Sequence, residues 1–119
     1  MQRSMFQRFG GPEAVAGLVL RFYDRVLAAE RLSPYFRDCD MRRLIEHQAK
    51  YLSAVMGGPA SYSEDELREM HAHLGVTGGD FDEMLRQLRG AMEEAGFARD
   101  DMDVVMRRYA SLRRVIVTR

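Results

Sequence analysis

Residues 11–29, GPEAVAGLVLRFYDRVLAA, carry the clearest structural pattern in the chain. Apolar side chains recur there every three or four positions, the spacing that places them on one face of a helix. Pro12 suits a first helical turn, because the N–H that proline lacks would be unpaired at that position. The pattern predicts an amphipathic helix whose buried face carries Val15, Leu18, Val19, Phe22, Tyr23, Val26 and Leu27.

Similar patterns on either side of glycine pairs predict an all-α protein. Ser33-Pro34 indicates a short turn, and Asp40 can cap a helix that ends at Gly57-Gly58-Pro59. Further helices are expected over residues 63–75, opened by a capping box, over 77–96, and from 102 to 116. The apolar faces of the last two helices carry Phe81, Met84, Leu85, Leu88 and Met92, and Met102, Val105, Met106, Tyr109, Leu112 and Ile116. No segment alternates with the period of a β-strand. We expect roughly five or six helices in a single domain over residues 1–119.

Composition narrows the function classes. The chain has 119 residues with 18 basic and 18 acidic side chains, so it offers no electrostatic case for nucleic acid or an anionic membrane. Cys39 is the only cysteine, which excludes an internal disulfide and fits a reducing compartment. No apolar run has the length of a signal-peptide core or a membrane span. These features predict a soluble, cytoplasmic protein.

One histidine is expected to face the core. On a helical wheel at ~100° per residue, His71 lies within about 50° of the centre of the face formed by Leu67, Met70 and Leu74. His73 lies off that face by roughly 110° on the same geometry and should be solvent-exposed. A buried imidazole needs a partner, which can be a backbone group or a metal such as iron.

Two further polar residues lie on apolar faces. Gln48 lies at the centre of the apolar face of the helix that Asp40 caps. Tyr23 lies on the apolar face of the helix over residues 11–29. Each can pair with core groups, or the two can serve each other with a small ligand between them. His47 lies at the edge of its stripe, about 100° from the centre, where histidines are usually half-exposed.

Other chemistries lack their motifs. There is no HExxH, CxxC, P-loop or GxGxxG sequence, and no Glu-x-x-His pair for a di-iron bundle. One cysteine and three histidines make a structural zinc site a poor interpretation.

Several motifs together resemble the truncated haemoglobins of group I. They are FGGPEAV (9–15), FYDRVL (22–27), LSPYF (32–36), MRRLIEHQAKYLSAVMGGP (41–59), HAHLGVT (71–77) and FDEM (81–84). The resemblance implies a two-over-two helical sandwich around haem. It assigns His71 as the proximal iron ligand, Tyr23 and Gln48 as hydrogen-bond donors to the bound ligand, and Phe36 as a haem-packing residue. Leu44 occupies the position of the distal histidine of longer globins.

The resemblance also indicates a wider haem environment. We expect cofactor contacts from Phe36, Leu44, Tyr51, Leu52, Tyr62, Leu67, Met70, Val76, Phe81, Arg43 and Arg68, with Arg43, Arg68 and Tyr62 as alternative partners of a haem propionate. His47 matches a position where some family members carry a second iron ligand, and a half-exposed histidine near a propionate is the alternative. Some members link haem covalently through a histidine near the C-terminus. The final stretch YASLRRVIVTR has none, so haem b should be non-covalent.

These residues imply a protein that binds O2, NO or CO. Donors from Tyr23 and Gln48 suit tight oxygen binding, and also suit oxidation of nitric oxide to nitrate with the help of a reductase. Two alternatives stay open. One is a six-coordinate His71–iron–His47 haem for electron transfer or redox sensing, and the other is a haem-free helical interaction domain.

Overall fold

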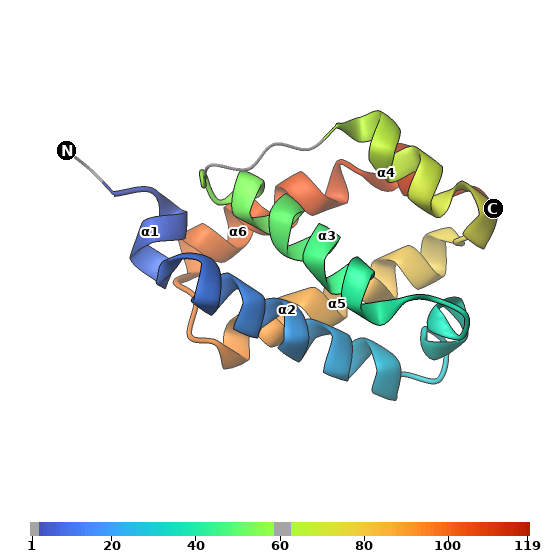
Figure 1. The fold of residues 1–119 in the computed structure, drawn as a ribbon, viewed down its shortest axis with the longest axis horizontal. Coiled ribbons are helices and arrows are strands. Elements are labelled where there is room, and N and C mark those ends of the chain that lie inside the picture. Colours follow the sequence, from blue (N-terminus) through green and yellow to red (C-terminus); the bar gives the residue numbers. More distant parts are fainter. Residues whose placement is uncertain (1–2, 59–62) are drawn as a thin grey trace.

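A computed structural model describes residues 3–58 and 63–119 of the chain, and within these residues every regular element is a helix (Figure 1). The longer helices are α2 (Gly11–Ala28), α3 (Met41–Val55), α4 (Glu64–His71), α5 (Gly78–Glu94) and α6 (Arg99–Ala110). The shorter elements are α1 (Met5–Phe9), α7 (Arg113–Ile116) and the 3₁₀ turns η1 (Ser33–Phe36) and η2 (Ala72–Leu74). This confirms the all-α prediction. No helix among the described residues is long and apolar enough to cross a membrane.

Two helix pairs build the core. Helix α2 packs on both α3 and α5, and α5 packs on α6, so the pair α2–α3 stacks on the pair α5–α6 (Figure 1). Fully buried side chains from each helix meet between the layers, including Leu18, Leu52, Met92 and Val105. Leu27 differs from the prediction: it is 43% exposed, although its spacing places it on the buried stripe of α2.

The predicted helix boundaries follow from local signals. Asp40, Ser63 and Thr77 cap α3, α4 and α5, each by a side-chain oxygen that accepts a hydrogen bond from a backbone N–H of the first turn. Gly75 closes the η2 turn after α4 in the left-handed region, at φ +65°, which glycine adopts without steric cost.

The N-terminal helix α1 was not predicted from the sequence. A reciprocal capping box opens it, in which Ser4 and Gln7 exchange side-chain-to-backbone hydrogen bonds. The Phe6 N–H then donates to the Met56 carbonyl at 2.9 Å, which ties α1 to the end of α3. A Cβ atom on Gly58 would lie 2.9 Å from the Phe6 ring, so this contact requires glycine.

The last predicted helix is wrong as a single element, because the chain forms α6 and α7 instead. At the break the Leu112 N–H bonds the Tyr109 carbonyl, three residues back, and the Ser111 hydroxyl bonds the Arg108 carbonyl. A serine hydroxyl that takes a backbone carbonyl competes with the regular helical ladder. Tyr109, Leu112 and Ile116 are nevertheless all buried, so the predicted face is continuous across the break.

Candidate functional site

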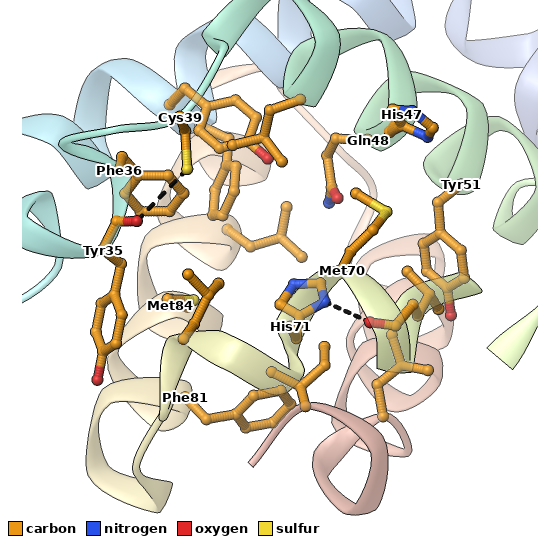
Figure 2. Close-up of a pocket in the computed structure, with 18 of the residues that line it drawn as sticks. Tyr35, Phe36, Cys39, His47, Gln48, Tyr51, Met70, His71, Phe81 and Met84 are labelled. Carbon is orange, nitrogen blue, oxygen red and sulfur yellow. Dashed lines mark hydrogen bonds between the residues drawn. The ribbon is translucent and has the colours of Figure 1, made fainter. Parts of the chain in front are cut away.

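A cavity of about 460 Å³ opens between the two helix pairs, within the range of ~300–1,000 Å³ that is usual for cofactor and ligand sites. Side chains from α2, η1, α3, α4, α5, α6 and α7 meet there (Figure 2). Its walls are predominantly apolar and aromatic. The apolar and aromatic lining residues are Phe22, Tyr23, Tyr35, Phe36, Leu44, Tyr51, Leu67, Met70, Leu74, Phe81, Met84, Leu85, Leu88, Tyr109, Leu112 and Ile116.

His71, the last residue of α4, presents its imidazole to this cavity (Figure 2). Its Nδ1 lies 2.7 Å from the Leu67 carbonyl oxygen, one turn back on the same helix. A carbonyl only accepts, so Nδ1 carries the proton and Nε2 carries the lone pair. Burial lowers the pKa of His71 below its ordinary value of 6.5, which keeps the ring neutral.

The geometry of His71 is compatible with both alternatives that the sequence left open. One ring nitrogen has the backbone partner of a core histidine. That same bond fixes the tautomer in which the other nitrogen is free to ligate a metal, and metal-ligating histidines commonly have such a backbone partner. His73, two residues on, is exposed in η2 as expected and lies at the edge of the cavity.

Gln48 enters the same cavity from α3, where the central place in its stripe predicted it (Figure 2). Its Nε2 donates a hydrogen bond of 2.9 Å to the hydroxyl of Tyr109. Of the alternatives predicted for Gln48, the structure shows a core partner, a residue 61 positions away on α6. The sequence predicted Tyr109 only as a residue on the apolar face of the last helix. No local pattern identified it as the partner of Gln48.

Tyr23 forms part of an aromatic wall. It is 5% exposed, and its ring contacts Phe22 and Phe36 edge-on, at centroid distances of 5.0 and 5.8 Å. Phe36 comes from η1 and Tyr23 from α2, so the wall joins the turn to the first long helix. Edge-to-face contacts of this kind restrict ring orientation.

The turn η1 is fastened to α5 by a polar cluster. The Tyr35 hydroxyl donates to Asp80 at 2.5 Å, and Arg31 lies 2.7 Å from the other oxygen of the same carboxylate. The hydrogen bond from Tyr35 holds the pKa of Asp80 below its ordinary value, with further lowering from Thr77 and Arg31. This cluster positions Phe36 at the cavity wall.

Most of the predicted contact residues line the cavity. Those that do are Phe36, Leu44, Tyr51, Leu67, Met70, Phe81 and Arg43, together with His47, which is half-buried on α3. Leu52 and Val76 are buried in the core outside the lining. Arg68 is exposed, lies outside the lining and pairs with Asp65 at 3.1 Å. Tyr62 lies outside the described residues.

Part of the cavity lining was not predicted from the sequence. Met84, Leu85, Leu88, Leu112 and Ile116 were predicted only as helix-stripe residues. Their periodicity identified them as inward-facing, and it does not distinguish a core from a cavity wall. Asp38, Cys39, Asp40 and His73 at the edge of the cavity had no signal for this role.

The comparisons with known proteins agree with this geometry. The family model of the bacterial-like globins matches residues 4–118. A group 1 truncated haemoglobin, GlbN, of Mycolicibacterium paratuberculosis is 33% identical over 115 residues, which cover 97% of this chain and 85% of that protein. The corresponding protein of Synechocystis is also 33% identical, over 82% of each chain. The chain belongs to the group 1 truncated haemoglobins.

Solved structures confirm the fold of this truncated haemoglobin. The Fe(III) form of truncated haemoglobin from Tetrahymena pyriformis superposes with a TM-score of 0.88 at 24% identity, over 98% of this chain and 100% of that one. The 2/2 haemoglobin of Synechococcus, in the cyanomet state with covalently attached haem, superposes with a TM-score of 0.86 at 25% identity, over 98% and 100% of the chains. The two-over-two sandwich predicted from the motifs is thus confirmed.

Membership of the globins implies a haem cofactor, and the cavity fits one. Within residues 3–58 and 63–119 no cluster of three or more His, Cys, Asp or Glu residues could hold a bare metal ion. The cavity instead presents the His71 imidazole, held in one tautomer by its bond to the Leu67 carbonyl, among predominantly apolar walls. An imidazole nitrogen in an apolar cavity would suit a metal whose remaining ligands come mainly with the cofactor, as in haem.

Proposed function

We propose that residues 1–119 form a single haem-binding domain that holds non-covalent haem b, with His71 as the proximal ligand, and binds the diatomic gases O2, NO and CO. The observation that carries this proposal is the bond from His71 Nδ1 to the Leu67 carbonyl at 2.7 Å. It leaves Nε2 as a lone-pair donor directed into an apolar cavity of suitable size.

Apolar side chains would hold the cofactor. Phe36, Leu44, Leu67 and Phe81 line the cavity and would bury the porphyrin. Arg43 is exposed at the rim, where its guanidinium could pair with a propionate, because guanidinium and carboxylate match in geometry. The chain has three histidines, all between residues 47 and 73, and so none near its C-terminal end, which supports non-covalent attachment.

A haem bound here supplies an iron that reversibly binds diatomic gases. The chain would contribute the hydrogen-bond donors that act on the ligand. Tyr23 and Gln48 both line the cavity, and hydrogen bonds to the partial negative charge of a bound gas are strong where water is excluded. Two donors in a buried site favour slow release of oxygen.

An absorption spectrum tests the proposal. The purified chain is supplied with haem, and spectra are taken oxidised, reduced and reduced with CO. A Soret band that shifts on reduction and again with CO supports the proposal, and extraction of the haem into acidified organic solvent supports non-covalent attachment. Absence of a Soret band would favour the alternative of a haem-free helical interaction domain.

We further propose oxidation of nitric oxide as the reaction of this site. One NO and one O2, with one electron from a separate reductase, combine to give one nitrate ion. The two donor side chains support this activity, because they would retain oxygen until NO arrives. A compartment with reductant is required, which we propose is the cytoplasm. Stoichiometric nitrate from the oxygenated protein mixed with NO supports the activity, and unchanged NO contradicts it.

The position of His47 favours a second candidate, a six-coordinate haem for electron transfer or redox sensing. His47 is half-buried, precedes Gln48 on α3 and lines the cavity. Figure 2 shows its ring beside the α3 ribbon, displaced from the space into which Gln48 points. Ligation would require a shift of α3, which opposes the dense packing of its buried side chains. A low-spin spectrum of the ligand-free ferrous protein would support this candidate, and a high-spin spectrum would exclude it.

A further inference from the structure

Tyr109 lies on the opposite helix pair from Gln48, yet the two side chains meet in the cavity. Tyr109 is the penultimate residue of α6 and is 8% exposed. Its ring contacts Tyr51 edge-on, at a centroid distance of 5.1 Å and an interplanar angle of 87°. Burial raises the pKa of the Tyr109 hydroxyl well above its ordinary value of 10, with a further rise from Tyr51 and Tyr23. The hydroxyl therefore stays protonated and neutral.

The Tyr109 hydroxyl accepts one N–H of the Gln48 amide at 2.9 Å. A glutamine amide has two N–H groups on the same nitrogen, so this bond uses one and leaves the other. The Gln48 side chain is only half-buried. Fixing such a long side chain in one rotamer costs conformational entropy, and the bond to Tyr109 offsets that cost. In the structure the bond holds the Gln48 side chain in one rotamer, with the amide nitrogen at this point of the cavity.

We propose that Tyr109 is a positioning residue for gas binding, which holds the Gln48 amide so that its second N–H donates to the bound ligand. This inference rests on the proposed gas-binding function. Tyr109 acts through Gln48 and does not itself contact the ligand. The rigid placement of Tyr109 against Tyr51 gives the amide a fixed anchor on α6.

The test is a double-mutant cycle on the haem-loaded protein with carbon monoxide. The C–O stretching frequency is recorded by infrared spectroscopy for wild type, Tyr109→Phe, Gln48→Leu and the double variant. Phenylalanine preserves the ring that contacts Tyr51 and removes only the hydroxyl. Loss of a hydrogen bond to the ligand raises the frequency, so Tyr109→Phe should raise it. Oxygen dissociation should accelerate about two- to ten-fold, the range for one neutral hydrogen bond.

The decisive comparison is the effect of Tyr109→Phe when Gln48 is already leucine. Positioning predicts no further rise of the C–O frequency in the double variant. An equal rise in both backgrounds would overturn the proposal, because Tyr109 would then act on the ligand directly. An unchanged frequency in the single variant would overturn it as well. Val105→Ala is the control: it weakens the packing of α6 at a fully buried site outside the cavity lining, and should leave the frequency unchanged.

A second measurement separates this inference from the proposed function. The same four variants of the full chain, without added haem, are unfolded in urea. A bond between Gln48 and Tyr109 predicts that the two substitutions are non-additive, by about two- to ten-fold in the unfolding equilibrium constant. If the chain takes up no haem, the proposed function fails while this coupling still supports the pair. Additive effects would overturn the positioning role whether or not haem binds.

Discussion

Replacement of Tyr23 by phenylalanine isolates the contribution of one hydroxyl to ligand retention. The ring is held by Phe22 and Phe36 at centroid distances of 5.0 and 5.8 Å, and the residue is 5% exposed. Phenylalanine keeps both contacts and creates no sizeable cavity, so packing should change little. The measured effect then reports the loss of the hydrogen bond from the hydroxyl to the ligand.

The size of the effect follows from that single bond. A hydrogen bond to a charged partner contributes about 1.5–3 kcal/mol, which corresponds to roughly a ten- to hundred-fold change in rate. We expect oxygen to dissociate faster from Tyr23→Phe by this factor. Gln48→Leu should have a smaller effect, because one of its two N–H groups is already bonded to Tyr109 and the side chain is half-buried.

The assay is stopped-flow displacement of oxygen by excess CO in the haem-loaded protein. Ser111→Ala is the control, since it removes a hydroxyl that donates to the Arg108 carbonyl outside the cavity lining. Its oxygen dissociation rate should equal that of wild type. Wild-type rates in both Tyr23→Phe and Gln48→Leu would refute the reasoning, because neither donor would then act on the ligand.

Four further predictions concern the histidines and the rim. His71→Ala should abolish stable haem binding while His73→Ala does not, measured as haem transfer to a scavenging apoglobin; normal coordination in the His71 variant would exclude it as the proximal ligand. If His47 ligates iron, His47→Ala should convert a low-spin ferrous spectrum to a five-coordinate one and accelerate CO binding, and a wild-type protein that is already high-spin contradicts this ligation. Arg43→Ala should accelerate haem loss several-fold, because one ion pair is removed, whereas Arg68→Ala should not, since Arg68 pairs with Asp65 outside the cavity; equal rates in all three proteins would refute a propionate contact by Arg43. Burial lowers the pKa of His71, so the unfolded chain is protonated first and the haem-free protein should lose stability as the pH falls below 6.5; urea titrations with the same pH dependence for wild type and His71→Gln would contradict this.

Local signals in the sequence determined most of the helices and the orientation of the key histidine. Caps at Asp40, Ser63 and Thr77 and the left-handed Gly75 depend on neighbouring residues only, so they can be read from a few positions. Helical periodicity likewise separated the inward His71 from the exposed His73, because it is a property of one helix. The motifs then indicated the family, which the comparisons confirmed.

Contacts between distant helices were decided only by the tertiary structure. Periodicity identifies an inward side chain, but it does not show whether that side chain meets core or cavity, which is why Met84 and Leu85 were not predicted as cavity residues. Leu52 and Val76, expected to contact the cofactor, lie in the core outside the lining. The partner of Gln48 could not be predicted either, because Tyr109 is 61 residues away and reaches it only when the α5–α6 pair stacks on the α2–α3 pair. Which side chains pair across a core depends on the angle and position at which whole helices cross. The spacing of residues within one helix does not determine that angle or position.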